Sequence, residues 1–437
     1  MEADILNRIM MLNPWHSRPG AFSEFLARQL PARFVPRSQD LRGLENRRKA
    51  KLVVGPRQAG KSTFILSLLR TREPGSVLVL NCEESLVRRW ASSAAGVLAD
   101  LASHFPSVDT VFLEEAQHLD GAGLLVKGLI DGRRDLDVLV TGSSSYHLMD
   151  RTRESLAGRA ERRVLLPFSL AEVSAEVPAV SPAAARIARR DLLRRMMVLG
   201  GYPAVWTGPE PRRELADLIE AFVIRDASDR FRIRRPEAFR RLLQLAAGQT
   251  GQIVNLSEWA GLLGVAASTV GEWLGLLEET WILKLVPPFA GGRRRELTGA
   301  ARVHFYDPGL RNALLGALDE DVGSRADRGA LAEGLAFAEL AKVSPPDWTL
   351  HHWRSKAGAE VDLVLARGDR ILGVEVKAGH RGRLPRGSRS FIEVYEPELF
   401  VVVTPSDAPV PDQELGRTRV RFLPLEDLVP ALAGAWS

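Results

Sequence analysis

The sequence predicts an α/β protein with a parallel sheet in its first part, followed by helical and further α/β parts. Between residues 51 and 170, short apolar runs alternate with longer helical or polar segments, a rhythm typical of parallel strands joined by helices. The length of 437 residues allows about two to four compact domains. The apolar runs, each a candidate strand, lie at 52–54, 77–80, 111–113, 138–140 and 164–166.

The composition indicates a folded protein and excludes a disulfide-stapled module. Hydrophobic residues make up 45% of the chain and charged residues 26%, close to globular averages. Cys82 is the single cysteine, which fits a reducing cytoplasm. No apolar stretch is long enough to cross a bilayer and the first residues are acidic, so we expect a cytoplasmic protein without membrane segment or signal peptide. The formal net charge of +5 is too small to indicate a nucleic-acid partner by itself.

The chain divides into predicted segments with different patterns. Pro178 and Pro182 lie close together and resist both helix and sheet, so they mark a linker. Further on, three helical patterns precede a hairpin, which is the order of a winged-helix domain. The last segment has a helix and then two strands joined by a turn at Gly368. The predicted segments are 1–50 (helical lead-in), 51–175 (parallel-sheet domain), 176–236 (helical), 237–324 (winged helix) and 325–437 (α/β unit).

A phosphate-binding motif follows the first predicted strand. The run Gly-Pro-Arg-Gln-Ala-Gly-Lys-Ser matches the P-loop pattern directly before a helical segment. Its glycines let backbone N–H groups face phosphates, Lys61 reaches the β- and γ-phosphates, and the Ser62 hydroxyl ligates Mg²⁺ at a helix N-terminus. The sequence therefore predicts a site for ATP and Mg²⁺. The predicted nucleotide contacts are Gly55, Pro56, Arg57, Gln58, Ala59, Gly60, Lys61, Ser62 and Thr63.

Three further positions complete the predicted nucleotide chemistry. Glu114 and Glu115 end the third predicted strand, where the first carboxylate would hold Mg²⁺ and the second would orient the attacking water. A pair of solvated acids is the alternative. Ser143, in a polar turn after the next strand, is a candidate sensor of the γ-phosphate. Arg159 precedes the fifth strand and is placed to reach the ATP of a neighbouring subunit, although an ordinary surface arginine is an equal alternative.

Short motifs occur in a specific order along the chain, at 13–15, 55–58, 114–117, 141–144, 156–159, 200–203, 225–226, 277–280, 305–310 and 353–355. In that order they resemble bacterial and archaeal AAA-type ATPases whose P-loop domain precedes a C-terminal region of unknown function. The resemblance implies an AAA-type core, a helical lid over 176–236 that places Pro203 near the adenine, and a homo-oligomer, expected as a hexameric ring. Glu114 stands where the family has aspartate.

Two regions are candidates for binding DNA. Residues 256–274 predict a helix-turn-helix with Gly264 in its turn, but the second helix shows Glu272, so a structural role is an equal alternative. A wing tip with three arginines is better placed to meet phosphates without reading bases. Arginines also gather over 225–241 and 381–389, where solvated helix faces are the alternative. The residues predicted to bind DNA are Arg293, Arg294 and Arg295.

A second acidic motif lies in the last segment. Glu375 and Lys377 alternate on one strand beside Asp362 on its hairpin partner, with Glu333 on the preceding helix. This arrangement resembles the PD-(D/E)XK nuclease superfamily. The resemblance implies that Asp362 and Glu375 bind Mg²⁺, that Lys377 holds the attacking water, and that Glu333 adds an outer carboxylate. A nuclease fold kept for binding without cutting, and exposed cross-strand salt bridges, are the alternatives.

The preferred interpretation is an oligomeric ATPase that acts on DNA. Branched DNA such as a Holliday junction is the expected substrate class, because the nuclease-like segment resembles junction resolvases and a ring motor suits strand movement. The alternative is a nucleotide-switched regulatory ATPase whose winged-helix and nuclease-like parts bind a partner protein or support assembly.

Overall fold

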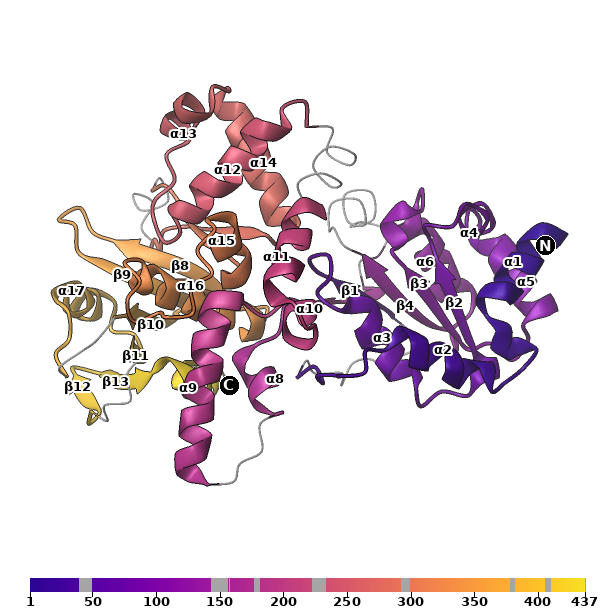
Figure 1. The fold of residues 1–437 in the computed structure, drawn as a ribbon, viewed down its shortest axis with the longest axis horizontal. Coiled ribbons are helices and arrows are strands. Elements are labelled where there is room, and N and C mark those ends of the chain that lie inside the picture. The colour runs from indigo at the N-terminus through magenta and orange to yellow at the C-terminus, as the bar shows by residue number, and fades with distance from the viewer. Residues whose placement is uncertain are drawn as a thin grey trace. The chain divides into compact units, whose positions relative to one another are not determined.

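The computed structural model separates the chain into two compact units, Met1–Leu166 and Pro167–Ser437 (Figure 1). The structure describes residues 1–38, 49–142, 156, 158–176, 181–221, 233–291, 299–377, 382–404 and 410–436. The predicted segments from residue 176 onward all belong to the second unit.

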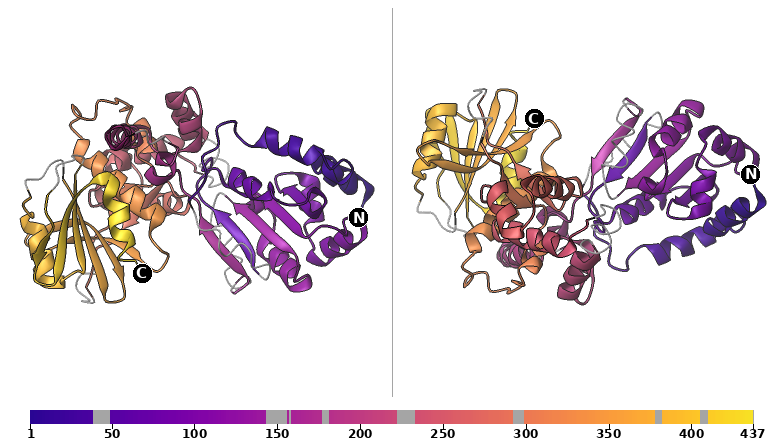
Figure 2. Two further views of the ribbon diagram at one scale, coloured as in Figure 1. Left: turned by 90° about the horizontal axis from the view of Figure 1, so that it is seen from below. Right: turned by 90° about the horizontal axis from the view of Figure 1, so that it is seen from above.

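The first unit is built on a sheet with the strand order β2-β3-β4-β1-β5. Every neighbouring pair of strands is parallel, which confirms the predicted α/β class with a parallel sheet. Helices lie on both faces of the sheet (Figure 2). The strands are β1 (Ala50–Val54), β2 (Val77–Asn81), β3 (Thr110–Glu114), β4 (Asp137–Gly142) and β5 (Ala160–Val164). The α-helices described in this unit are α1 (Ala3–Leu12), α2 (Ala21–Gln29), α3 (Lys61–Leu69), α4 (Ser85–Trp90), α5 (Ala94–His104) and α6 (Ala122–Gly132).

The last strand of this sheet begins earlier than the sequence predicts. The apolar run at 164–166 predicts the strand there, whereas β5 ends at Val164. β5 lies at the edge of the sheet, beyond β1, and its residues are exposed or half-buried. An edge strand carries charged residues such as Glu161 and Arg163, so a search for apolar runs misses it.

The N-terminal segment covers the opposite edge of the sheet, which is formed by β2. The side-chain amide of Asn13 donates to the Val79 carbonyl over 2.9 Å, and its oxygen accepts the Val79 N–H over 2.6 Å. The indole N–H of Trp15 donates to the Val77 carbonyl over 2.8 Å. These bonds satisfy backbone groups that would otherwise face outward from an edge strand. The motif at 13–15 therefore has a structural role.

The first half of the second unit is helical and has one continuous apolar core, whose members run from Val198 to Leu314. The predicted helical and winged-helix segments therefore share a core. Three helices, α12 to α14, precede the antiparallel hairpin β6–β7, in the order that the sequence predicts. The elements are α8 (Leu170–Ser174), α9 (Pro182–Leu199), α10 (Pro203–Thr207), α11 (Pro211–Glu220), α12 (Pro236–Gly248), α13 (Leu256–Leu263), α14 (Ala267–Glu279), β6 (Leu283–Val286), β7 (Arg302–Phe305) and α15 (Pro308–Leu314).

Helices α13 and α14 are both apolar and are joined by a sharp bend. No described helix has by itself the length and apolarity to cross a membrane, and only this pair meets that test when its two helices are taken together. The pair is bent by 102°. Trp259 of α13 and Leu274 of α14 are fully buried in the core of the second unit.

Two glycine motifs meet inside this helical half. The buried Asp307 carboxylate accepts the Gly201 N–H over 2.7 Å and the Leu310 N–H over 2.9 Å, so it caps α15 and holds the end of α9 against it. A Cβ on Gly200 would lie 2.1 Å from an Asp307 oxygen, and one on Gly309 would lie 2.0 Å from the Leu199 carbonyl. The motifs at 200–203 and 305–310 thus form one packed junction.

The second half of this unit is a mixed sheet in the order β12-β13-β11-β10-β9-β8. The antiparallel pair β9–β10 is the hairpin that the sequence predicts, with its turn at Gly368. The elements are α16 (Arg328–Val343), β8 (Thr349–Arg354), β9 (Glu360–Arg367), β10 (Arg370–Val376), α17 (Arg386–Tyr395), β11 (Leu399–Thr404), β12 (Gln413–Leu415), β13 (Thr418–Pro424) and α18 (Leu428–Ala433).

Candidate nucleotide site and carboxylate cluster

The P-loop connects β1 to α3, and its conformation depends on glycine. Gly55 has φ 153°, and a Cβ there would lie 2.1 Å from the Leu165 carbonyl oxygen, so only glycine fits. Gly60 is left-handed at φ 87° and directly precedes α3. The nine-residue helix α3 begins at Lys61, so the backbone N–H groups of its first turn, including that of Thr63, are directed toward the loop. Gln58 also has positive φ, at 59°.

The functional side chains of the loop lie close to the end of β3. Lys61 is 5% exposed and its ammonium donates to the carbonyls of Gly55 over 3.1 Å and Pro56 over 2.8 Å. The Ser62 hydroxyl is near enough to the Glu114 carboxylate to lower its pKa. Burial raises the pKa of Glu114, the Ser62 hydroxyl lowers it, and the neighbouring Glu115 raises it again. The structure thus brings Lys61, Ser62 and Glu114 together across the ends of two parallel strands.

Glu115 is held by its neighbours in a left-handed conformation with φ 52°. Its N–H donates to the Thr141 hydroxyl of β4 over 3.2 Å, and the Gln117 side-chain amide donates to its carboxylate. A non-glycine residue in this conformation is uncommon and is typical of functional sites. The strand order explains the contact with Thr141, because β4 lies directly between the phosphate-loop strand and the acidic strand.

The other predicted nucleotide contacts lie elsewhere. Arg159 is on the surface of the first unit, where its guanidinium Nε donates to Asp131 over 2.7 Å and its side chain is 40% exposed. Pro203 belongs to the second unit and is the first residue of α10. Ser143 lies outside the described residues. The roles of these three residues stay predictions.

The four residues of the second acidic motif lie together in the second unit. Asp362 and Glu375, on neighbouring antiparallel strands, are 7% and 2% exposed. Asp362 accepts the Val376 N–H over 2.8 Å, and the Lys377 ammonium lies 2.6 Å from a Glu375 oxygen. Glu333 approaches from α16. Burial raises the pKa of Asp362, Glu375 and Glu333. The charge of Asp362 raises the pKa of Glu333 and Glu375 further, and that of Glu360 raises the pKa of Asp362.

Sequence reasoning missed the side chain that faces this cluster, Arg302 at the start of β7. Its guanidinium lies 2.7 Å from Glu360, 3.7 Å from Asp362 and 3.8 Å from Glu333. Arg302 is 5% exposed. The buried ring of His304, two residues later, reaches to 3.7 Å from Glu333. The sequence gives one signal for this contact: Arg302 is a charged residue at the first position of a short strand that also holds apolar residues.

The cluster has the right donor chemistry for Mg²⁺ but not the arrangement. Carboxylate oxygens are the ligands that Mg²⁺ prefers. Among the residues that the structure describes, however, no three His, Cys, Asp or Glu side chains are placed to hold one metal ion. The Arg302 guanidinium lies beside Glu333, Glu360 and Asp362, and the Lys377 ammonium lies beside Glu375. The Mg²⁺-binding roles of Asp362 and Glu375, and the roles of Lys377 and Glu333 beside them, stay predictions.

The predicted DNA-binding residues fall into two groups. Arg293, Arg294 and Arg295 lie outside the described residues. In the arginine group over 225–241, the described Arg235 donates to the Gly264 carbonyl over 2.7 Å, and Arg241 donates to the Leu262 carbonyl over 2.8 Å. These two guanidiniums bind the end of α13 and its turn, and a role of this arginine group in binding DNA stays a prediction. The helices α13 and α14 meet at 102°, an angle in the usual range for a helix-turn-helix, about 90–120°.

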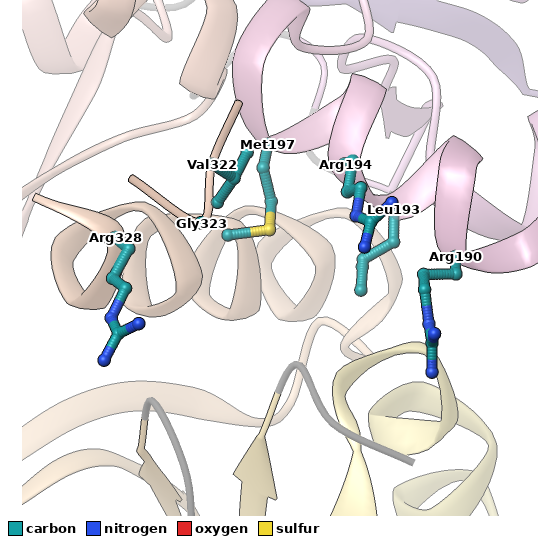
Figure 3. Close-up of a pocket in the computed structure, with 7 residues that line it drawn as sticks. All are labelled: Arg190, Leu193, Arg194, Met197, Val322, Gly323 and Arg328. Carbon is teal, nitrogen blue, oxygen red and sulfur yellow. The ribbon is translucent and has the colours of Figure 1, made fainter. Parts of the chain in front are cut away.

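A pocket of about 160 Å³ lies between α9 and the segment around the start of α16. Its apolar floor is formed by Leu193, Met197 and Val322. Arg190 and Arg328 lie at opposite ends of the pocket with the apolar side chains between them (Figure 3). Because these guanidiniums do not converge on one point, the pocket does not define a site for a single anion.

Three family models match separate parts of the chain. Residues 47–174 match a model described as an AAA domain. Residues 190–321 match a domain of unknown function (DUF8612), and residues 328–428 match another (DUF4143). The first match covers the parallel sheet and the P-loop. The chain therefore contains an AAA-type P-loop ATPase domain, followed by the C-terminal domains of unknown function that the sequence resemblance implies.

Relatives and solved structures are similar to this chain at low identity. An uncharacterized protein of Mycobacterium tuberculosis is 26% identical over 373 residues, covering 84% of this chain and 79% of that protein. An uncharacterized protein of Haemophilus influenzae is 23% identical over 341 residues, covering 75% and 82%. The replication initiator DnaA bound to AMPPCP and single-stranded DNA is 13% identical with a TM-score of 0.27, covering 56% of this chain and 90% of that chain. A Signal Transduction ATPase with Numerous Domains from Pyrococcus horikoshii is 9% identical with a TM-score of 0.26, covering 72% and 47%. TM-scores this low carry no argument about this chain.

Proposed function

We propose that the first unit hydrolyses ATP with Mg²⁺ at its P-loop. The observation that carries this proposal is the geometry of the loop, in which Gly55 and Gly60 have positive φ and the buried Lys61 ammonium lies against the loop at the start of α3. The Ser62 hydroxyl at the start of α3 interacts with the Glu114 carboxylate at the end of β3 and lowers its pKa. A hydroxyl and a carboxylate oxygen fit Mg²⁺, which when bound neutralises charge on the β- and γ-phosphates. Lys61 precedes Ser62 and is the group that binds the γ-phosphate, in exchange for the loop carbonyls that it contacts here.

Glu115 is the base that orients the attacking water. Its backbone is fixed by Thr141 and its carboxylate by Gln117, so the side chain is positioned before substrate arrives. Glu115→Gln keeps the shape of the side chain but removes the base. We expect this variant to bind ATP as the wild type does and to hydrolyse it at least about 100-fold more slowly. Lys61→Ala should lose both binding and hydrolysis, which separates the two roles.

The sequence leads us to expect a homo-hexameric ring as the active oligomer. In this oligomer each nucleotide site is shared between two subunits. Arg159 supplies a positive charge to the γ-phosphate of its neighbour, and the exposed pair with Asp131 is its resting position. A mixing experiment tests this arrangement. Lys61→Ala and Arg159→Ala should each be inactive alone, but an equal mixture should regain about a quarter of wild-type activity, because about a quarter of its interfaces carry both intact residues. No recovery in a mixture shown to co-assemble would refute a role for Arg159 in trans.

DNA is the proposed partner of the second unit. The support is the helix-turn-helix geometry of α13 and α14, with Gly264 left-handed between them at φ 65° and Ser268 exposed at the start of the second helix. The wing arginines would add phosphate contacts. Branched DNA such as a Holliday junction is the proposed substrate class. The C-terminal nuclease-like sheet then binds DNA, and cleaves it only in a conformation that differs from the one described.

The test measures the ATPase rate with duplex, single-stranded and four-way-junction DNA at two salt concentrations. The affinity for each DNA is measured directly under the same conditions. We expect binding to weaken as salt rises, and replacement of Arg293, Arg294 and Arg295 by alanine to reduce the slope of log K against log salt by up to about 3. Ser268→Asp should weaken binding by charge repulsion. Its matched control is Ser103→Asp, which puts the same charge on an exposed position of α5. Equal effects of the two aspartates would argue against the helix-turn-helix.

A nucleotide-switched regulatory ATPase is the second candidate function. The contacts of Arg235 and Arg241 with α13 carbonyls favour it, because guanidiniums used inside the fold are not free to bind phosphates. The exposed Glu272 on α14 also suits a protein partner better than DNA. If no DNA form changes the ATPase rate and none binds in a salt-dependent way, this function replaces the first.

A further inference from the structure

The carboxylate cluster of the second unit is formed by side chains from separate parts of the fold. Asp362 comes from β9, Glu375 from β10 and Glu333 from α16. Arg302 comes from β7, the strand that closes the hairpin after the three-helix part. Its guanidinium is 5% exposed and lies within 4 Å of Asp362 and Glu333, with Glu360 as its shortest contact at 2.7 Å. A positive side chain thus enters an acidic group built on other elements.

The cluster holds more carboxylates than cationic side chains. Arg302 lies within 4 Å of Glu333, Glu360 and Asp362, and Lys377 pairs with Glu375, so two cationic side chains face four carboxylates. Within the described part of the chain, Glu375 Oε2 and Glu333 Oε1 are buried without a hydrogen-bond partner. A buried carboxylate oxygen without a partner carries a desolvation penalty that a cation would relieve. The raised pKa values of these acids have the same origin, since their negative charges are incompletely balanced.

A histidine points to the same place. His304 is fully buried and stacks on Phe337 at 4.8 Å, and its Nε2 lies 3.7 Å from Glu333 Oε1. Neither ring nitrogen of His304 has a hydrogen-bond partner among the described residues. Gly251 backs the same carboxylate: its φ is 81°, and a Cβ there would lie 2.9 Å from a Glu333 oxygen. Buried acceptors and an unpartnered imidazole therefore surround the position that Arg302 shares.

We propose that Arg302 is the built-in cation of this cluster, and that a divalent cation binds to Asp362, Glu375 and Glu333 only when the guanidinium is withdrawn. Arg302 and the ion compete because both are attracted by the same carboxylates at less than 4 Å. The contact also fastens the hairpin to the C-terminal sheet, where the Phe289 N–H donates to the His352 carbonyl over 2.6 Å. The contact is thus autoinhibitory: the arrangement described keeps the nuclease-like site closed to metal.

Mn²⁺ binding to the nucleotide-free full chain tests the proposal, measured by calorimetry and by the electron spin resonance signal of free Mn²⁺. Arg302→Gln should bind Mn²⁺ about tenfold or more tightly than the wild type, comparable to effects of neighbouring groups on metal affinity. Arg302→Lys, which keeps the charge, is the matched control and should stay near the wild type. Adding Asp362→Asn to Arg302→Gln should remove the gain in Mn²⁺ affinity. That loss would show that the ion binds to the carboxylate cluster.

A second variant protects the test against misfolding. Arg302→Gln leaves buried carboxylates without their cation, so its folding is checked by thermal unfolding. Glu360→Gln leaves the three inner carboxylates intact and weakens only the shortest contact of Arg302, and it should raise Mn²⁺ affinity by a smaller factor. Glu360 is half exposed, so this variant should fold normally. If neither variant binds Mn²⁺ more tightly than the wild type, Arg302 does not compete with metal and the proposal is wrong.

The outcome is independent of the proposed ATPase. Lys61→Ala abolishes nucleotide chemistry in the first unit and should leave the Mn²⁺ affinities of all these variants unchanged. Failure of ATP hydrolysis would therefore not affect the result at Arg302. Wild-type protein that already binds Mn²⁺ as tightly as Arg302→Gln, with binding lost in Asp362→Asn, would overturn the competition while leaving the nucleotide site untouched.

Discussion

Replacement of Asp137 by asparagine should destabilise the first unit by about 3 kcal/mol. Asp137 begins β4 and is 1% exposed. One carboxylate oxygen accepts from the ammonium of Lys51, which is also 1% exposed, and the other lies 2.9 Å from the guanidinium of Arg72. Asparagine has nearly the same size, so the substitution creates no cavity and changes only charge and hydrogen bonding.

The magnitude follows from the unequal burial of the two cations. Removal of one partner from a buried ion pair costs about 3–5 kcal/mol, because the remaining charge stays out of water. Lys51 meets this condition, since its side chain is only 1% exposed and cannot reach solvent. Arg72 is 32% exposed and can turn toward water, so its share is at most about 1 kcal/mol. The asparagine oxygen still accepts one hydrogen bond, which places the total near the lower end of the range.

Calorimetry of the full chain with and without ADP measures this effect, because nucleotide raises the melting temperature of the unit that binds it. For the 166-residue first unit, 3 kcal/mol corresponds to a decrease of about 6–12 °C in that transition. Arg72→Gln is the control and should shift it by no more than about 4 °C. Adding Lys51→Met to Asp137→Asn should restore part of the loss. A decrease below about 3 °C, or a double variant no more stable than the single one, would refute the reasoning.

Three further predictions concern the thiol, the loop glycine and the packed junction. Burial raises the pKa of the Cys82 thiol to about 12, so the unfolded chain loses this proton before the folded chain does as pH rises. The free energy of unfolding should therefore fall above about pH 9, by up to about 1.4 kcal/mol per pH unit. Urea unfolding of Cys82→Ala should lack this contribution. Gly55→Ala places a Cβ 2.1 Å from the Leu165 carbonyl oxygen, so it should destabilise the first unit by about 1–3 kcal/mol. It should also abolish binding of an ATP analogue, and unchanged binding would count against the loop geometry. Asp307→Ala leaves the Gly201 N–H unpaired and should lower the stability of the second unit by about 2–4 kcal/mol, seen as a shift of the ADP-insensitive transition; Asp307→Asn should lose less.

Features that depend on neighbouring residues could be predicted from the sequence. The P-loop and the sheet follow from patterns within a few positions, and the hairpin β9–β10 follows from two strands and a turn at Gly368. The edge strand β5 was misplaced by its charged residues, because half-exposed positions do not need to be apolar. Local patterns predict elements well where burial is uniform and poorly at the edges of a sheet.

Contacts between distant positions could not be predicted in the same way. Arg302 and Glu360 are separated by 58 positions, and nothing near Arg302 in the sequence indicates the three carboxylates around it. The Asp307 carboxylate bonds an N–H that lies 106 positions earlier. Both are polar groups that only the assembled core brings together. Recognition of the motifs at 200–203 and 305–310 was possible without knowing that they touch.

The same limit decides how an arginine cluster should be interpreted. Arg235 and Arg241 belong to a positively charged stretch of sequence that suits phosphate, yet each guanidinium binds a backbone carbonyl at the end of α13. Arg302 makes the stronger case, because it follows the predicted wing arginines in the sequence but its guanidinium balances carboxylates in a buried cluster. Charge along a chain measures what could attract phosphate, whereas burial and hydrogen bonding determine which guanidiniums remain available for it. The salt dependence of DNA binding reports only the guanidiniums that are available to phosphate. The slope of log K against log salt should therefore be set by the wing arginines, and it should not change when Arg235 is replaced by alanine in a folded protein.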